Sequence, residues 1–350
     1  MNEFLKDDQS IESQFRSIVL FGRNVATYKF ALAHSLLDLS QQDKTFVSLE
    51  ELSPIFAKYM LEHVQSGKRQ ITSQSSQFIN ALHLYDEDKI TWDQLMFVTE
   101  RKGFNNVIDA FHNLFEGEIT SPFYEKSVQG KKLGISLTDS IYLLNESLHF
   151  SNLANEIEGR WNLVESAWTE RNPNLIVNYD IDSEELFFLK SMTAERYMNS
   201  HFRINLTPVR KSLNGYQKGK CFYCYRKISI DSGLEDTCDV DHFIPLSIQY
   251  STDKDLTLNG VWNLVLCCKE CNRGEENGKF ARVPVRLLLD RLFKRNEYLI
   301  NSNHPLKETI LMITGNNSKM RKHFIEGIYN HAASIKKTTW EPKKCFDNAF

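Results

Sequence analysis

Four cysteines form two pairs whose spacing is typical of a zinc site. Two residues separate Cys221 from Cys224, and two separate Cys268 from Cys271. This gap lets both sulfurs of a pair face one ion at about 2.3 Å, and two pairs supply the four thiolates of a tetrahedral structural Zn²⁺. The 43 residues between the pairs exceed the loop of a simple zinc ribbon, so we expect an insertion there. Four buried or redox-active thiols are the alternative interpretation.

The other three cysteines do not extend this pattern. Cys267 offers a second register for the last pair, but the two-residue spacing favours Cys268. Cys238 and Cys345 have no partner at metal-site spacing, and we interpret them as ordinary cysteines.

Polar residues in and just after the insertion could perform acid–base and metal chemistry. They are Asp241 and His242 in CDVDHFIPLS, Asn263 in GVWNLVLCC and Asn272 in CKECNRGEENGK. A neutral imidazole can take a proton from water near neutral pH. Carboxylate and amide oxygens suit a hard divalent cation such as Mg²⁺. Singly, each residue has an ordinary explanation in a turn, a loop cap or a helix start, so only the combination indicates a site.

The order Cys-x-x-Cys, Asp-His, Asn, Cys-x-x-Cys-Asn resembles the zinc-stabilised HNH (ββα-metal) endonuclease family. The resemblance is confined to the region of the four cysteines. It implies that His242 is the general base and that Asn263 braces the loop carrying this histidine. It also implies that Asp241 and Asn272 bind a catalytic Mg²⁺ or Mn²⁺, and that the products carry a 5′ phosphate and a 3′ hydroxyl.

Two positions depart from the pattern that is common in that family. Many relatives have a histidine where this chain has Asn272, and a neutral amide makes Zn²⁺ a poor candidate for the catalytic ion. Many also carry a lysine three residues later, where this chain has Glu275. Because Asp241 and His242 are adjacent on an expected strand, the chain must bend for both to approach one site.

The elements expected around this site indicate an α+β protein with three parts. Residues 1–200 are predicted to form a mainly α-helical domain, and residues 201–285 the small zinc-stabilised ββα-metal (HNH) domain. Residues 286–350 are predicted to form a basic C-terminal helical extension. Apolar residues at helical spacing predict helices over 26–40 and 152–169.

Local signals place further helices. Ser48 with Glu51, and Thr91 with Gln94, match the capping box that starts a helix. The second of these helices should end near Gly103. Helices are also predicted over 138–144, 285–299 and 319–334.

Charge is distributed unevenly along the chain, although the net charge is only -3. Residues 1–200 hold 18 Lys and Arg against 29 Asp and Glu, whereas residues 201–350 hold 24 against 16. Since Lys and Arg neutralise phosphate groups, we expect DNA to contact the C-terminal part. The alternative, to which we give equal weight, is that the charges of both parts are merely solvated and bind no polyanion. The nucleic-acid contacts that we expect are Arg210, Lys211, Lys218, Lys220, Arg273, Lys279 and Arg282.

The composition excludes several classes of protein. Hydrophobic residues make up 41% and charged residues 25% of the chain, as in ordinary globular proteins, so we do not expect large-scale disorder. Glu3, Asp7 and Asp8 stand where a signal peptide would be basic, and no stretch approaches the roughly 20 apolar residues of a membrane span. We therefore expect a cytoplasmic protein without membrane contact, whose thiols stay reduced.

The leading hypothesis is an endonuclease that cuts one or both strands of DNA. The acidic N-terminal domain would regulate cleavage, bind a regulatory protein partner or select the substrate. Fold analogy suggests bacterial defence against foreign DNA, in an antiphage or restriction system; a homing or recombination-associated nuclease is the alternative setting. The rival functions are a non-catalytic zinc-stabilised nucleic-acid-binding module and an RNA-cleaving HNH enzyme, which would keep the same site.

Overall fold

The computed structural model describes residues 3–73, 75–115, 117–170, 176–191, 201–251, 258–302 and 305–346. The chain divides into two compact units, Met1–Asn172 and Pro173–Phe350. The division falls after Asn172, whereas the sequence placed a boundary near residue 200, so residues 173–200 belong to the second unit. No helix in the described part of the chain is long and apolar enough to span a membrane.

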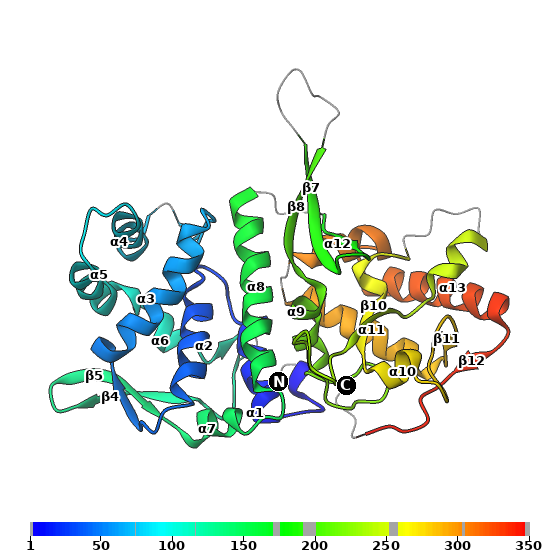
Figure 1. Cartoon of the computed structure of the whole chain (residues 1–350), viewed down its shortest axis with the longest axis horizontal. Coiled ribbons are helices and arrows are strands. Elements are labelled where there is room, and N and C mark those ends of the chain that lie inside the picture. The colour runs from blue at the N-terminus through cyan, green and yellow to red at the C-terminus, as the bar shows by residue number, and fades with distance from the viewer. Residues whose placement is uncertain are drawn as a thin grey trace. The chain divides into compact units, whose positions relative to one another are not determined.

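Helices dominate the first unit, and two of them begin with the expected capping boxes (Figure 1). The hydroxyl of Ser48 accepts the backbone N–H of Glu51 at the start of α3 (Leu49–Gln65). The hydroxyl of Thr91 accepts the backbone N–H of Gln94 at the start of α5 (Trp92–Val98). These two predictions from the sequence are confirmed.

The longest helix of this unit carries the expected apolar stripe. Leu153, Ile157 and Trp161 are buried on α8 (Phe150–Glu170). The core of the unit therefore forms along this helix, where α1 and α2 also contact it. The other helical elements are α1 (Ile11–Phe21), α2 (Tyr28–Leu39), α4 (Gln77–Asp86), α6 (Val107–Ala110) and α7 (Asp139–Asn145), with the short η1 (Glu3–Leu5) and η2 (Thr99–Gly103).

Two small antiparallel sheets accompany these helices. One sheet has the order β1 (Phe46–Ser48), β5 (Lys132–Leu137), β4 (Tyr124–Gln129). In the other, β2 (Asn113–Leu114) pairs with β3 (Gly117–Glu118). Glycine is required at position 134 on β5, because a Cβ there would lie 2.2 Å from the carbonyl oxygen of Val47.

The second unit opens with a three-stranded antiparallel sheet. Its order is β6 (Asn178–Asp180), β7 (Glu185–Ser191), β8 (His201–Pro208). The short helices α9 (Val209–Leu213) and η3 (Asn214–Gln217) then lead into the first cysteine pair.

A ββα arrangement lies at the centre of the second unit. Strand β9 (Asp239–His242) pairs antiparallel with β10 (Leu264–Cys267), and α10 (Lys269–Arg273) follows β10 directly. Two helical turns, η4 (Leu246–Ser251) and η5 (Val261–Asn263), lie between the strands. The α+β class with a small ββα unit, expected from the sequence, is confirmed.

Three helices and a returning strand complete the second unit. They are α11 (Leu287–Asn301), α12 (Leu306–Thr314) and α13 (Ser318–Lys336), which confirm the helices predicted over 285–299 and 319–334. After α13, β12 (Thr339–Trp340) pairs in parallel with β11 (Val283–Pro284).

The basic residues of α11 do not form one solvated face. Arg295 is fully buried, and burial lowers its pKa to about 9. The guanidinium of Arg291 lies 3.8 Å from the ring centroid of Tyr225 and donates to the carbonyl oxygen of Tyr223 at 2.8 Å. Arg291 therefore packs against the segment that carries the first cysteine pair, whereas Arg295 donates to the carbonyl oxygen of Trp262 at 3.3 Å.

Candidate active site and metal site

The four paired cysteines converge on one point. The sulfurs of Cys221, Cys224, Cys268 and Cys271 all lie within 4.8 Å of one another, and those of Cys224 and Cys268 are 3.7 Å apart. Sulfurs at about 2.3 Å from a tetrahedral Zn²⁺ would lie about 3.8 Å apart, so the donor set fits a structural metal. Hydrogen bonds among the thiols, with Cys221 the largest contributor, lower the pKa of Cys224 and Cys268, whereas burial raises the pKa of Cys221.

Local backbone geometry places both cysteine pairs. Cys268 is the N-cap of α10, so the first turn of this helix brings Cys271 beside it. In the first pair, the N–H of Cys221 donates to the carbonyl oxygen of Arg226 at 2.7 Å. The side-chain amide of Gln217 bonds both the N–H and the carbonyl oxygen of Leu266, at 2.9 and 2.8 Å, which ties the first pair to β10.

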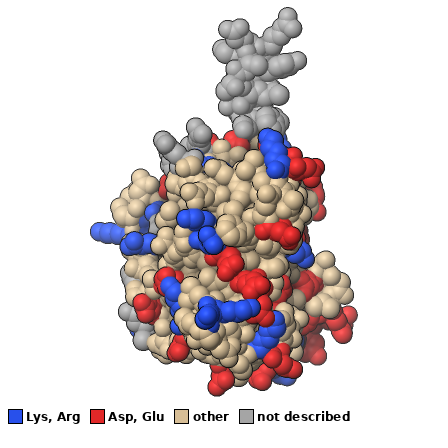
Figure 2. All heavy atoms as spheres, turned by 90° about the vertical axis from the view of Figure 1, so that its left-hand side faces the viewer, with Lys and Arg blue, Asp and Glu red and all other residues tan. Residues whose placement is uncertain are grey.

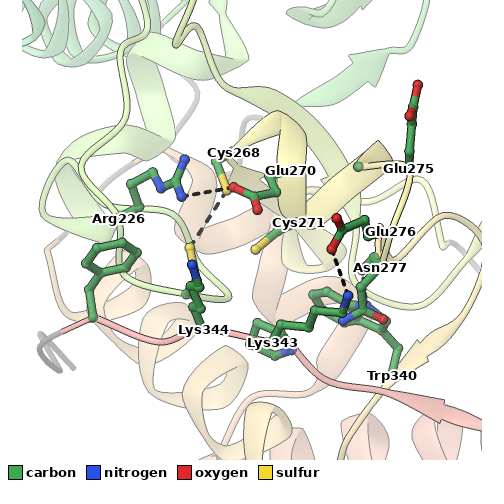
Figure 3. A pocket seen from close by; sticks show the side chains of 14 residues that line it. Arg226, Cys268, Glu270, Cys271, Glu275, Glu276, Asn277, Trp340, Lys343 and Lys344 are labelled. Atoms are coloured by element: carbon green, nitrogen blue, oxygen red, sulfur yellow. Dashed lines mark hydrogen bonds and ion pairs between the residues drawn. The ribbon is translucent and has the colours of Figure 1, made fainter.

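The C-terminal segment lies beside this cluster (Figure 3). The N–H of Phe346 donates to the carbonyl oxygen of Cys224 at 2.8 Å. Lys343 forms an ion pair with Glu276 at 2.9 Å. Three acidic and three basic side chains line the pocket between the segment and the cluster, so this pocket has no charge preference for a phosphate.

His242 ends strand β9 and is half-buried. Its Nε2 lies 2.8 Å from the side-chain oxygen of Asn259. Burial lowers the pKa of His242 below its usual range, although the hydrogen bond with Asn259 and the charge of Asp241 act in the opposite direction. A lowered pKa keeps the imidazole neutral at neutral pH, which is the form that accepts a proton.

Asn263 fastens the chain that follows His242. Its amide oxygen accepts the N–H of Ile244 at 2.8 Å. Its amide nitrogen donates to the carbonyl oxygens of Ile244 and Leu258, at 2.9 and 2.8 Å. The side chain is fully buried, and both of its amide hydrogens are used in these contacts. Asn263 therefore holds together the two ends of the segment between His242 and β10 and does not face a substrate.

The carboxylate of Asp241 is enclosed by two partners. The hydroxyl of Tyr223 donates to Oδ2 at 2.6 Å, and Nζ of Lys279 lies 3.0 Å from Oδ2 and 3.3 Å from Oδ1. Lys279 also donates to the carbonyl oxygen of His242 at 2.9 Å, and its side chain has no exposed surface. Lys279 therefore neutralises Asp241 from inside the unit and does not offer its charge to DNA, contrary to the contact expected for it.

Asn272 and Asp239 form a second polar group. The amide nitrogen of Asn272, on α10, donates to Oδ2 of Asp239 at 3.0 Å. The exposed guanidinium of Arg273 bonds the same carboxylate, at 2.9 Å from Nε and 3.1 Å from Nη2. Asp239 and Asp241 are two residues apart on β9 and so lie on the same face of the strand. Asp239 thereby joins the residues around the site.

The ligands expected for a catalytic cation come from β9 and α10, as the ββα arrangement requires. Carboxylate and amide oxygens are donors that Mg²⁺ and Mn²⁺ accept, and the amide oxygen of Asn272 has no partner among the described residues. Within the same residues, the four cysteines are the only group of three or more His, Cys, Asp or Glu side chains placed to hold an ion. A divalent cation would share Asp241 with the ammonium of Lys279. The donor types therefore fit such a cation, whereas the local charge opposes tight binding.

The basic residues expected to contact nucleic acid differ in exposure. Lys218 and Lys279 are buried, so neither presents its charge to a phosphate. Arg210 and Arg282 each donate to a backbone carbonyl oxygen. Lys211, Lys220 and Arg273 keep exposed surface. Among the described residues, none of these three side chains donates to a backbone carbonyl oxygen.

Three residues around the site were not predicted from the sequence. Asp239 stands two residues before Asp241 in CDVDH, a spacing that places both on one strand face and could have indicated it. Tyr223 lies inside the first cysteine pair, and its contact with Asp241 follows only from the fold. Asn259 carries no local signal that marks it as the partner of His242.

Comparison with known protein families gives a match in the second unit. Residues 221–279 match the family model described as HNH endonuclease. No curated protein and no solved structure matches the chain significantly. The matched range contains both cysteine pairs, strand β9 and Asn272. The match and the four converging cysteines confirm the resemblance to an HNH endonuclease with a metal-binding cysteine cluster.

Proposed function

We propose, from the HNH endonuclease domain at residues 221–279, that the chain is a metal-dependent endonuclease that hydrolyses phosphodiester bonds of DNA. The observation that carries the proposal is the double support of His242. Asn259 bonds its ring, and Asn263 fastens the backbone that follows it. An imidazole supported in both ways is preorganised to accept a proton from water.

Each residue of the site has a role in the proposed reaction. His242 takes the proton of the water molecule that attacks phosphorus, and the cleaved strand keeps a 5′ phosphate and a 3′ hydroxyl. Asp241 and Asn272 would hold Mg²⁺ or Mn²⁺, which when bound stabilises negative charge on the phosphate and on the leaving oxygen. Asn263 keeps the loop after His242 in place. A structural Zn²⁺ on the four cysteines would hold the ββα unit together.

Two alternatives share part of this site. A non-catalytic binding module would need the cysteine cluster but not the supports around His242, and these supports favour the enzyme. An RNA-cleaving enzyme would need the same groups, because phosphodiester and metal are alike in the two polymers. DNA is the substrate that we propose, and RNA is an outcome of the test.

We further propose a biological setting from fold analogy alone. HNH proteins with helical N-terminal parts often belong to bacterial systems that act against foreign DNA, and a role in such defence would suit this chain. The acidic first unit would then regulate cleavage or bind a partner protein. Its charge, opposite to that of the second unit, supports this assignment.

The direct test of the nuclease compares two histidine variants. Purified protein is incubated with supercoiled plasmid, linear duplex DNA or single-stranded RNA, in Mg²⁺, Mn²⁺ or EDTA. His242→Ala is compared with His323→Ala, which removes an exposed histidine of α13 in the same unit. We expect His242→Ala to reduce the cleavage rate by about 10²- to 10⁴-fold, as is typical for the loss of a general base.

The outcomes separate the candidate functions. Metal-dependent cutting of DNA that survives His323→Ala and is lost in His242→Ala, with the metal content of the cysteine cluster unchanged, would support the proposal. Equal cutting by both variants would exclude His242 as the base. Cutting of RNA alone would replace the substrate, and binding without cutting, both by the intact chain and by residues 173–350, would favour the binding module.

A further inference from the structure

The two ring nitrogens of His242 have different surroundings. Nε2 lies 2.8 Å from the side-chain oxygen of Asn259. For Nδ1, no partner is found among the residues that the structure describes. A neutral imidazole carries one proton, and only the nitrogen without it can accept another. Which nitrogen acts as the base therefore depends on which one Asn259 keeps protonated.

The orientation of the Asn259 amide follows from its second contact. Its nitrogen lies 3.2 Å from the carbonyl oxygen of Tyr179. A backbone carbonyl oxygen can only accept a hydrogen bond, so the NH₂ group of Asn259 must face Tyr179. Its oxygen must then face His242, and this settles an assignment that the shape of an amide leaves open.

The orientation of Asn259 in turn determines the tautomer of His242. An amide oxygen can only accept, so the nitrogen beside it must carry the proton. We propose that Asn259, itself oriented by the main chain of Tyr179, is a positioning residue that holds His242 with Nε2 protonated and Nδ1 as the base. This inference rests on the proposed function of His242 and adds the residue that orients it.

One of the residues that support His242 lies outside the range that matches the HNH family model. Tyr179 lies on β6, far in the sequence from the matched range 221–279. Its ring centroid is also 6.2 Å from that of His242. The β6–β7–β8 sheet therefore contributes to the site through a backbone carbonyl, which any residue type at position 179 would supply. Between the carbonyl of Tyr179 and the ring of His242, the connection is made by the side chain of Asn259.

The test uses two replacements of similar size at position 259. Asn259→Asp keeps an oxygen acceptor facing Nε2, whereas Asn259→Leu removes it. The ¹⁵N chemical shifts of the His242 ring, measured by NMR in the intact chain at a pH where the ring is neutral, report the tautomer directly. Steady-state cleavage of linear duplex DNA gives kcat and KM for the same proteins.

We expect wild type and Asn259→Asp to show a protonated Nε2 and a bare Nδ1, and Asn259→Leu to show a mixture of the two tautomers. Loss of a group that orients a functional histidine typically costs about 10- to 100-fold, and we expect this loss in the kcat of Asn259→Leu with little change in KM. Asn259→Asp should lose less than Asn259→Leu. A general effect on folding would not separate the two variants by tautomer.

Two results would overturn the inference. One is an Asn259→Leu protein that keeps the wild-type tautomer and kcat; the other is a wild-type ring protonated on Nδ1. Failure of the proposed function looks different. In that case the tautomer still follows the residue at position 259, but His242→Ala leaves cleavage unchanged.

Discussion

At the scale of single residues, Lys279 and Asp241 form a buried ion pair beside the backbone of His242. The side chain of Lys279 has no exposed surface and that of Asp241 is 11% exposed, with 3.0 Å between Nζ and Oδ2. Removing one partner of such a pair leaves the other charge uncompensated. We therefore expect Lys279→Met to lower the free energy of unfolding by about 3–5 kcal/mol, measured by urea unfolding without added Mg²⁺ or Mn²⁺ and with the metal of the cysteine cluster retained.

The exposed ion pair of Lys343 with Glu276 provides the control for this prediction. Lys343→Met should cost less than about 1 kcal/mol, because exposed ion pairs contribute little. In Lys279→Met, Mn²⁺ should restore more stability than it adds to wild type, since the cation would no longer compete with an ammonium for Asp241. Equal costs for the two lysine variants would contradict the assigned role of Lys279.

His63 of the first unit gives a second prediction at this scale. Its Nδ1 lies 2.8 Å from Glu165, and its Nε2 lies 3.4 Å from Glu158. Burial lowers the pKa of His63, but the hydrogen bonds and charges of the two carboxylates outweigh burial and raise the pKa to about 9. A folded-state pKa above the unfolded value near 6.5 means that this stabilisation is complete below about pH 6.5 and is lost as the pH rises through about 9.

The free energy of unfolding of the first unit should therefore fall by on the order of 2–3 kcal/mol between about pH 6.5 and 9. Denaturant unfolding followed by tryptophan fluorescence across this range would measure the slope. His63→Gln should flatten it. His83→Gln, at an exposed histidine of α4, should leave the slope as it is in wild type. A wild-type protein whose stability does not change over this range would refute the prediction.

At the scale of elements, the ββα unit is too short to be stable by its backbone alone. Strands β9 and β10 have four residues each and α10 has five, whereas isolated helices below about 12 residues and isolated strand pairs are marginal. The cysteine cluster joins α10, which carries Cys268 and Cys271, to the segment that carries Cys221 and Cys224. A structural metal in such a site can contribute on the order of 10 kcal/mol to folding.

Removal of the metal should therefore unfold the ββα unit before the rest of the chain. We expect a chelator, or Cys224→Ser, to abolish cleavage and to lower the melting temperature of the second unit, with loss of bound zinc measured by elemental analysis. Cys345→Ser is the matched control, because this cysteine is exposed and lies outside the cluster. Full zinc content in Cys224→Ser would count against the assigned ligand set.

The elements that could be predicted from the sequence are those that form because of residues close together in the chain. The helices after Ser48 and Thr91 follow from capping boxes, and the cysteine cluster follows from spacing. The burial of Lys279 was not predictable, because its partner Asp241 lies on a different element and meets it only in the folded chain. Asn259 was missed for the same reason. A contact between distant segments leaves no periodic signal in either of them.

At the scale of the whole molecule, charge follows the division into two units. Residues 1–172 hold 16 Lys and Arg against 24 Asp and Glu, and residues 173–350 hold 26 against 21. On the face drawn in Figure 2, acidic and basic side chains are interspersed and form no surface of one sign. The contrast between the units is one of net charge, which acts on the long-range attraction of DNA.

The unit boundary determines which fragments test regulation by the first unit. A fragment of residues 173–350 keeps β6 and the carbonyl of Tyr179 that orients Asn259, whereas one of residues 201–350 loses β6 and β7. If the acidic unit restrains cleavage, residues 173–350 should cut plasmid faster than the full chain, most clearly at low salt, where charge repulsion of DNA is least screened.

The shorter fragment provides the internal control for that comparison. Residues 201–350 should cut about 10- to 100-fold more slowly than residues 173–350, because the amide beside His242 loses its backbone partner. Equal rates for the full chain and residues 173–350 would exclude regulation by the first unit under these conditions. Equal rates for the two fragments would instead show that the β6–β7–β8 sheet is dispensable, and the orientation of Asn259 would then have to come from the HNH domain itself.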